Sequence, residues 1–224
     1  MIFTERMSLK QPYCGIWIWS DNWSLKVPLL IASFQLDTTA LFGELYWTLS
    51  DQLDLTVGLR YTDEEKESTQ RTIYLNFLSD PTGPNGGYET FGNDWQETTG
   101  KVNLNYNLSD EIMLYTTIAR SYKSGGFNTL SPGNPLLDPA LGGDPSLAYF
   151  EPEFIDSLEV GAKTRLFDNT LQANLTAFFY DYEGMQVSKI IQQSSVNQNI
   201  DSTIFGIEGE FIYAPNENWT FSWN

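Results

Sequence analysis

The chain has 224 residues, a formal net charge of −17 at pH 7, a single cysteine and no histidine. The acidic excess argues against nucleic acid as a partner, because contacts with phosphates need basic patches. One cysteine allows no internal disulfide, and the lack of histidine removes the usual zinc sites and any catalytic triad with a histidine base.

The first clear strands lie in the N-terminal third. Residues 13–19 are rich in β-branched and aromatic side chains and form the first strand candidate. From Thr38 the residues alternate with period two, which predicts strands with one apolar and one polar face. After a short turn the alternation continues through residue 61, so Leu55 and Val57 are expected to face lipid and Arg60 to face the interior.

The same alternation returns in residues 157–166, 171–179 and 205–213. In the second of these strands, Leu175 and Ala177 are expected to face lipid. No window of about 18 consecutive apolar residues is present, so no transmembrane helix is expected.

The strand at residues 112–122 is less decisive, because both of its faces begin apolar. It carries Arg120. A cation on the lipid face costs about 2–4 kcal/mol at mid-membrane, so Arg120 is expected to face the interior.

Short turns rich in Asp, Asn and Ser alternate with long connections along the chain. The predicted strands run about 10–15 residues, whereas strands of soluble sandwiches run about 5–6. Short turns at one end and long loops at the other are the layout of an outer-membrane β-barrel, with the short turns in the periplasm. The sequence therefore predicts an all-β fold, an antiparallel transmembrane β-barrel segment of about nine or ten strands. The turns are residues 50–52, 108–111, 167–169 and 214–217, and the long connections are residues 76–93, 123–150 and 184–199.

The amino-acid sequence of these strands resembles that of TonB-dependent outer-membrane receptors of the siderophore-receptor type. The stretches that carry the resemblance occur in the family's order and spacing between Thr38 and Tyr213. They are GLRY at residues 58–61, ARSYKSGGFN at 119–128, SLEVGAK at 157–163, NLTAFFYDY at 174–182 and GIEGE at 206–210.

This resemblance implies an energised importer of a scarce nutrient, most often a ferric siderophore, in the outer membrane of a Gram-negative bacterium. In the family a plug domain fills a barrel of about 22 strands. Residues 1–224 would be a partial barrel domain, open as an arc in isolation, with the plug domain and the C-terminal strands lying outside them. Met1 is interpreted as an internal start, because no signal peptide follows it.

The implied partners are the TonB complex, reached through the plug domain, an iron-siderophore or similar small ligand, and outer-membrane lipid; no cofactor and no enzymatic activity are expected. Two alternatives stay open at this point. One is a passive porin-like channel. The other is an outer-membrane enzyme barrel, although such chemistries usually use a histidine.

Candidate ligand-binding residues lie where the extracellular mouth and the lumen are expected. Siderophore sites in similar receptors combine aromatic and basic residues, whereas the structural alternative for the aromatic ones is the outer aromatic girdle. No catalytic residues are expected, and the acidic clusters lack the spacing of a calcium loop, so no metal site is expected. The candidates are Tyr88, Phe91, Trp95, Arg120, Lys123 and Phe127.

Charged residues at interior positions of the strands allow two interpretations. They could meet an anionic ligand or acidic plug residues, or they could form a structural ladder of salt bridges. The second interpretation is favoured, with Glu159, Glu208 and Glu210 as the partners. The cations concerned are Arg60, Arg120, Lys163 and Arg165.

Overall fold

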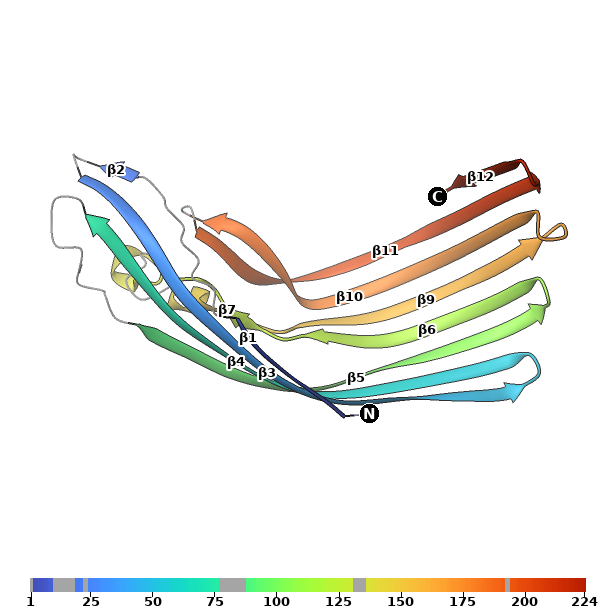
Figure 1. Ribbon diagram of the computed structural model, residues 1–224, viewed down its shortest axis with the longest axis horizontal. Coiled ribbons are helices and arrows are strands. Elements are labelled where there is room, and N and C mark those ends of the chain that lie inside the picture. Colours follow the sequence, from blue (N-terminus) through green and yellow to red (C-terminus); the bar gives the residue numbers. More distant parts are fainter. Residues whose placement is uncertain (1, 10–18, 22–23, 77–87, 131–135, 192–193) are drawn as a thin grey trace.

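A computed structural model describes residues 2–9, 19–21, 24–76, 88–130, 136–191 and 194–224, with side chains described in 32–70, 88–130, 136–191 and 194–224. Almost all of this is β-strand (Figure 1). Among the described residues, no helix has the length and apolarity needed to cross a membrane. The long strands are β3 (Ser24–Ser50), β4 (Leu53–Asn76), β5 (Glu89–Ser109), β6 (Ile112–Lys123), β9 (Glu153–Leu166), β10 (Leu171–Ile191) and β11 (Ser194–Asn216). The short elements are β1 (Ile2–Leu9), β2 (Trp19–Asp21), β7 (Gly126–Phe127), the 3-10 helices η1 (Pro139–Leu141) and η2 (Pro145–Ala148), β8 (Tyr149–Phe150) and β12 (Trp219–Trp223).

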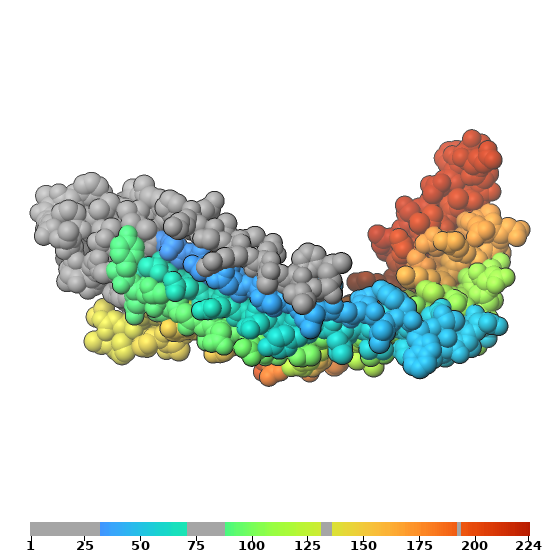
Figure 2. Space-filling view, turned by 60° about the horizontal axis from the view of Figure 1, so that its bottom comes forward, coloured from blue at the N-terminus to red at the C-terminus, as the bar shows by residue number. Residues whose placement is uncertain are grey.

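The sheet has ten strands, in the order β1-β3-β4-β5-β6-β9-β10-β11-β12 with β2 attached to β3. All neighbouring strands within it are antiparallel. The sheet is an open arc, because β12 at one end stands well apart from β3 near the other (Figures 1 and 2). The prediction of an all-β, antiparallel and unclosed barrel segment is confirmed.

Local hydrogen bonds explain why the predicted short turns form. In three of them a side-chain oxygen accepts from the backbone N–H two residues later: Ser50 Oγ from Gln52 N, Ser109 Oγ from Glu111 N, and Asn216 Oδ1 from Asn218 N. Such bonds imitate a backbone turn, which is why Ser, Asn and Asp dominate these positions. The remaining turn instead places Phe167, Asp168 and Asn169 at positive φ of 53–67°.

The two faces of the sheet differ as the alternation predicts. Across the arc, the register places Val57 opposite Val102, and Ala177 opposite Val160. The large apolar side chains of this convex face stay exposed; they include Leu45, Trp47, Leu59, Val102, Ile118, Leu158, Leu175, Phe205 and Ile207. This face is the one that Leu55, Val57, Leu175 and Ala177 were predicted to share.

The strands extend further than the sequence predicts. β3 has 27 residues and β11 has 23. Most of the loop predicted at residues 184–199 is instead the far end of the β10–β11 hairpin, and residues 89–93 already belong to β5. The polar residues that form these ends do not alternate with apolar ones, so their strand conformation left no periodic signal. Of the first strand candidate only Trp19 is described, in β2; the rest lies outside the described residues.

The neighbouring hairpins end at different heights, and this positions the site. β6 pairs with β5 only up to Arg120 opposite Gly100, whereas β5 runs on to Glu89. On the other side, β9 begins pairing with β10 at Phe154 opposite Glu183, whereas β10 runs on to Ile191. A notch therefore opens between the far ends of β5 and β10, above β6 and β9.

Candidate functional site

The connection from β6 to β9 lies in this notch, and its described residues 124–130 and 136–150 are called the wedge. On one side it bonds to Lys66 of β4. The Lys66 Nζ atom lies 2.6 Å from Ser124 Oγ, 2.9 Å from the Gly125 carbonyl oxygen and 3.1 Å from Glu64 Oε1. An ammonium group has three N–H donors, so these three acceptors saturate it. Lys66 is therefore occupied by the wedge rather than available to an anionic ligand.

The bonds of Lys66 to Ser124 and Gly125 form a first latch, and a second latch of hydrogen bonds joins the wedge to both β4 and β11 through Asn128. Gln70 Nε2 of β4 donates to the Asn128 carbonyl oxygen at 3.0 Å. The Asn128 Nδ2 atom donates to the Asn197 carbonyl oxygen at 2.9 Å, and its Oδ1 accepts from Asn197 N at 2.7 Å. Gln70 and Asn128 are buried, and a buried hydrogen bond of this kind is costly to break because it leaves polar atoms without partners.

Two small apolar clusters pack the wedge against β5 and β11. In the first, Phe91 of β5 packs with Phe127 and Ala148 of the wedge, and the ring of Tyr149 meets both phenylalanines edge-on at 5.7 and 5.5 Å. In the second, Val196 of β11 packs with wedge residues; the members are Leu130, Leu136 and Val196. The wedge is thus a packed structure with a core of its own.

The two consecutive glycines of the wedge allow a close approach of backbones. A Cβ atom on Gly125 would lie 2.5 Å from the Phe150 carbonyl oxygen and 3.0 Å from the Trp95 ring. A Cβ atom on Gly126 would lie 2.7 Å from the Phe150 ring. Only glycine fits at such contacts. The Ser-Gly-Gly-Phe-Asn stretch is therefore a packing motif in this structure.

The acidic residues of the wedge cap its two short helices. Asp138 accepts a hydrogen bond from Ala140 N, and Asp144 accepts one from Ser146 N, each at 2.9 Å. Hydrogen bonds from the Ser146 side chain and backbone lower the pKa of Asp144 below its usual value. These carboxylates act as N-caps. Among the described residues, no group of three or more His, Cys, Asp or Glu side chains is placed to hold a metal ion.

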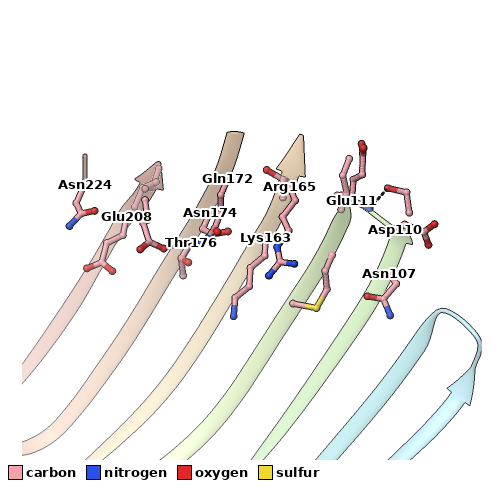
Figure 3. Close-up of a pocket in the computed structure, with 17 residues that line it drawn as sticks. Asn107, Asp110, Glu111, Lys163, Arg165, Gln172, Asn174, Thr176, Glu208 and Asn224 are labelled. Atoms are coloured by element: carbon pink, nitrogen blue, oxygen red, sulfur yellow. Dashed lines mark hydrogen bonds between the residues drawn. The ribbon is translucent and has the colours of Figure 1, made fainter. Parts of the chain in front are cut away.

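A hollow of about 1080 Å³ lies on the concave face near the short turns and is called the trough (Figure 3). Lys163 and Arg165 of β9 project into it on one side, and Glu208 of β11 on the other. Between them β10 contributes a column of neutral side chains, Gln172, Asn174 and Thr176. The trough therefore confirms a polar concave face, in which β10 is uncharged and acidic residues lie on both of its sides, Asp110 and Glu111 near Arg165 and Glu208 and Glu210 on β11.

The predicted ladder of salt bridges is wrong in its partners. Among the described side chains, Lys163 and Arg165 of β9 form no ion pair with Glu208 or Glu210 of β11 across the intervening strand β10. Glu159 instead accepts a hydrogen bond from Tyr180 Oη, and Glu210 accepts one from Asn174 Nδ2 at 2.8 Å. Lys163 lies over the Tyr115 ring at 5.6 Å. An ion pair across an intervening strand does form between β3 and β5, where Lys101 lies 2.7 Å from Glu44 over Gly58 of β4, which has no side chain to keep them apart.

The comparisons with known proteins agree with this architecture. Residues 18–224 match the family described as TonB dependent receptor-like, beta-barrel. The chain belongs to the TonB-dependent receptor family. The pesticin receptor of Yersinia enterocolitica is 29% identical over 191 residues, which is 84% of this chain and 25% of that protein. The pesticin receptor of Yersinia pestis is 28% identical over the same shares. The chain thus spans about a quarter of the length of the curated relatives it matches.

Two solved structures show the same fold. The ferric yersiniabactin uptake receptor FyuA from Yersinia pestis aligns with a TM-score of 0.68 at 18% identity, covering 89% of this chain and 28% of FyuA. The siderophore receptor PiuA from Acinetobacter baumannii aligns with a TM-score of 0.60 at 17% identity, covering 85% of this chain and 25% of PiuA. The sheet described above is therefore a section of a TonB-dependent receptor barrel.

Within this receptor barrel section, the candidate ligand-binding residues divide into two groups. Phe91 and Phe127 are each only 8% exposed because they form the core of the wedge. Trp95 lies beneath Lys66, with Nζ 5.5 Å from its ring centroid. Tyr88 and Lys123 are exposed, and their contact with a ligand stays a prediction. Sequence reasoning missed the wedge anchors Lys66, Gln70 and Asn197, because their partners lie 58 or more residues away in the chain.

The prediction that Arg120 faces the interior is wrong. Arg120 lies opposite Gly100 on β5, and Gly100 lies opposite Leu59, so all three share the convex apolar face. Its guanidinium lies 4.7 Å from the Phe154 ring centroid and pairs with Asp156 at 2.5 Å. Arg120 is eight residues from the start of β6, about 27 Å along an antiparallel strand. Because barrel strands tilt by about 35–45°, this length spans about 20 Å across the membrane, so Arg120 lies towards the outer side of an apolar band of about 25 Å, where a cation costs less than at mid-membrane.

Replacing Arg120 by Ala is expected to change the free energy of unfolding by less than about 1 kcal/mol, because exposed ion pairs contribute little. The two side chains are 43% and 56% exposed. Denaturant titration in lipid vesicles measures the change. A loss of 3 kcal/mol or more, the scale of a broken buried pair, would show that Arg120 is held in a desolvated environment instead.

Proposed function

We propose that this chain forms part of the wall of an active transporter in the outer membrane of a Gram-negative bacterium, which imports a scarce nutrient of the ferric siderophore class. The observation that carries the proposal is the family match over residues 18–224, borne by a sheet with an exposed apolar convex face and a polar concave face. The names of the similar proteins, a ferric yersiniabactin uptake receptor and a siderophore receptor, support the cargo class.

The proposed transporter takes its energy from the TonB complex, through a plug domain outside residues 1–224. The trough supports a contact with such a domain, because Lys163, Arg165 and Glu208 project into it without forming ion pairs among the described side chains. A folded segment with complementary charges would neutralise both sides of the trough. TonB-dependent receptors are transport proteins, and nothing in the proposed role requires catalysis.

Cargo contact is assigned to the exposed members of the predicted set. Lys123 is three residues after Arg120 in β6, so its side chain points to the opposite, concave face, next to the wedge. A lysine there can attract an anionic ferric complex as it enters the lumen. Tyr88 lies just before β5 and offers an aromatic face. Phe91, Trp95 and Phe127 act indirectly, by holding the wedge in place.

Uptake of ⁵⁵Fe-siderophore by iron-starved cells that carry the full-length gene tests the proposal. Uptake is expected to require both this gene and TonB. Lys123→Ala is expected to raise the apparent KM for uptake with little change in the maximal rate, whereas Arg120→Ala, which removes a cation from the opposite face, is expected to leave both unchanged. Uptake that persists without TonB would instead indicate a passive porin-like channel, and uptake that is independent of this gene would overturn the proposed cargo.

A further inference from the structure

Two residues of the wedge bond to both of the long hairpins that flank the notch. The Ser124 hydroxyl oxygen accepts a hydrogen bond from Lys66 Nζ of β4 at 2.6 Å. The Ser124 carbonyl oxygen accepts one from Gln186 Nε2 of β10 at 2.9 Å. Asn128 bonds to Gln70 of β4 and to Asn197 of β11. In the sheet, β6 and β9 separate these hairpins, so the wedge connects strands that are not neighbours.

A further set of hydrogen bonds anchors Glu151 and Glu153, which follow the wedge in the chain, to the β10–β11 hairpin. Asn199 Nδ2 donates to the carbonyl oxygens of Glu151 and Gly184 at 2.8 and 2.7 Å, and Asn199 Oδ1 accepts from Glu151 N at 2.7 Å. Gln186 N donates to Glu153 Oε2 at 2.7 Å. The Asn199 side chain therefore joins the residue that follows the wedge to both strands of the β10–β11 hairpin.

We infer that the wedge is a mechanical coupler. It makes the projecting ends of the β4–β5 and β10–β11 hairpins one cooperative unit, so that loosening the wedge on one hairpin loosens the other. The physical basis is that Ser124 and Asn128 cannot keep their bonds to one hairpin in the same geometry when the other hairpin moves. The saturated ammonium of Lys66 and the buried amides of Gln70 and Asn128 make such a movement costly.

This coupling is independent of the cargo proposed above, because it concerns only hydrogen bonds and packing within the described residues. The coupling also affects where Lys123 lies relative to the two hairpins. A coupled pair of hairpins keeps the exposed Lys123 at a fixed height relative to both, whereas independent hairpins would let the wall around it open on one side only.

Amide hydrogen exchange of the full-length protein in outer-membrane vesicles tests the coupling. Lys66→Met removes the bonds from β4 to Ser124 and Gly125 and leaves the bonds of Asn128 to Gln70 and Asn197 in place. We expect exchange to rise by about tenfold or more both at residues 66–70 of β4 and at residues 194–199 of β11. The matched control is Lys101→Met, which breaks the ion pair with Glu44 within the sheet and is expected to leave both segments unchanged.

A second pair of variants keeps the test decisive if Lys66→Met fails to fold. Asn128→Ala removes the side-chain bonds to Asn197 of β11 and keeps the bond from Gln70, which goes to the backbone carbonyl oxygen. Asn103→Ala is its control, because the side-chain bonds of Asn103 to described residues go to Thr116 and Thr117 of the adjacent strand. Asn128→Ala is expected to raise exchange on both hairpins by a similar factor. Exchange that rises only at residues 66–70 in Lys66→Met, or on a single hairpin in Asn128→Ala, would overturn the coupling.

Discussion

Replacing Leu175 by Arg is expected to cost about 2–4 kcal/mol of folding free energy in a bilayer, the cost of a cation at mid-membrane on a barrel's lipid face. Leu175 lies in the middle of the membrane section of β10 and is exposed on the convex face. Its cross-strand neighbours are Ala162 on β9 and Gly209 on β11. These small, apolar neighbours offer an arginine no hydrogen-bond partner and no carboxylate.

The matched control is Asn174→Arg, one residue earlier and on the opposite face. Asn174 projects into the trough and donates to Glu210, so an arginine there meets a carboxylate and water. Its cost is expected to be well below that of Leu175→Arg. Denaturant titration in lipid vesicles compares the two variants. Equal losses of stability at both positions would contradict the assignment of the faces.

The sheet itself could be predicted because its determinants are local in sequence. Within the membrane section one face of each strand meets lipid and the other meets the polar interior. Apolar and polar residues therefore alternate with period two over the whole section. The short turns were readable for a similar reason: Ser50, Ser109 and Asn216 each bond to a backbone N–H only two residues away. Both signals lie within one window of the sequence.

The wedge could not be predicted, because its determinants are distant in sequence. Asn128 and Asn197 are 69 positions apart, and Lys66 and Ser124 are 58 apart. Beyond the membrane both faces of a strand meet water or another segment, so the alternation that marks a strand disappears. Aromatic residues such as Phe91 and Phe127 then look like exposed loop side chains, although they form a core.

The position of Arg120 shows that the energetic cost of a cation on the lipid face does not by itself decide which face a basic residue occupies. The penalty for a cation on the lipid face depends on its depth in the membrane, and the residues of this strand alone do not mark where the apolar band ends. The register supplies part of that measure: on β6, β9 and β10, Arg120, Asp156 and Asp181 form one cross-strand row on the convex face, next to the apolar row of Ile118, Leu158 and Phe179. On these three strands the row marks where charged side chains first appear on that face.

Replacing Leu130 by Ala is expected to destabilise the wedge by about 2–5 kcal/mol, the range for deleting a fully buried leucine side chain. Leu130 is 0% exposed and packs with Leu136 and Val196, which joins the wedge to β11. The cavity left by the deletion cannot collapse easily, because the hydrogen bonds of Asn128 hold the same segments apart.

Leu141→Ala is the matched control, since Leu141 lies in the same wedge but is 68% exposed. Its substitution is expected to change stability by no more than about 0.5 kcal/mol. Limited proteolysis of the protein in outer-membrane vesicles, followed over time, reports the opening of the wedge: Leu130→Ala should be cleaved within residues 124–150 much faster than the parent, and Leu141→Ala at the parent's rate. Equal cleavage of the two variants would mean that the apolar cluster does not hold the wedge. The hydrogen bonds of Lys66, Gln70 and Asn199 would then be sufficient to keep it closed.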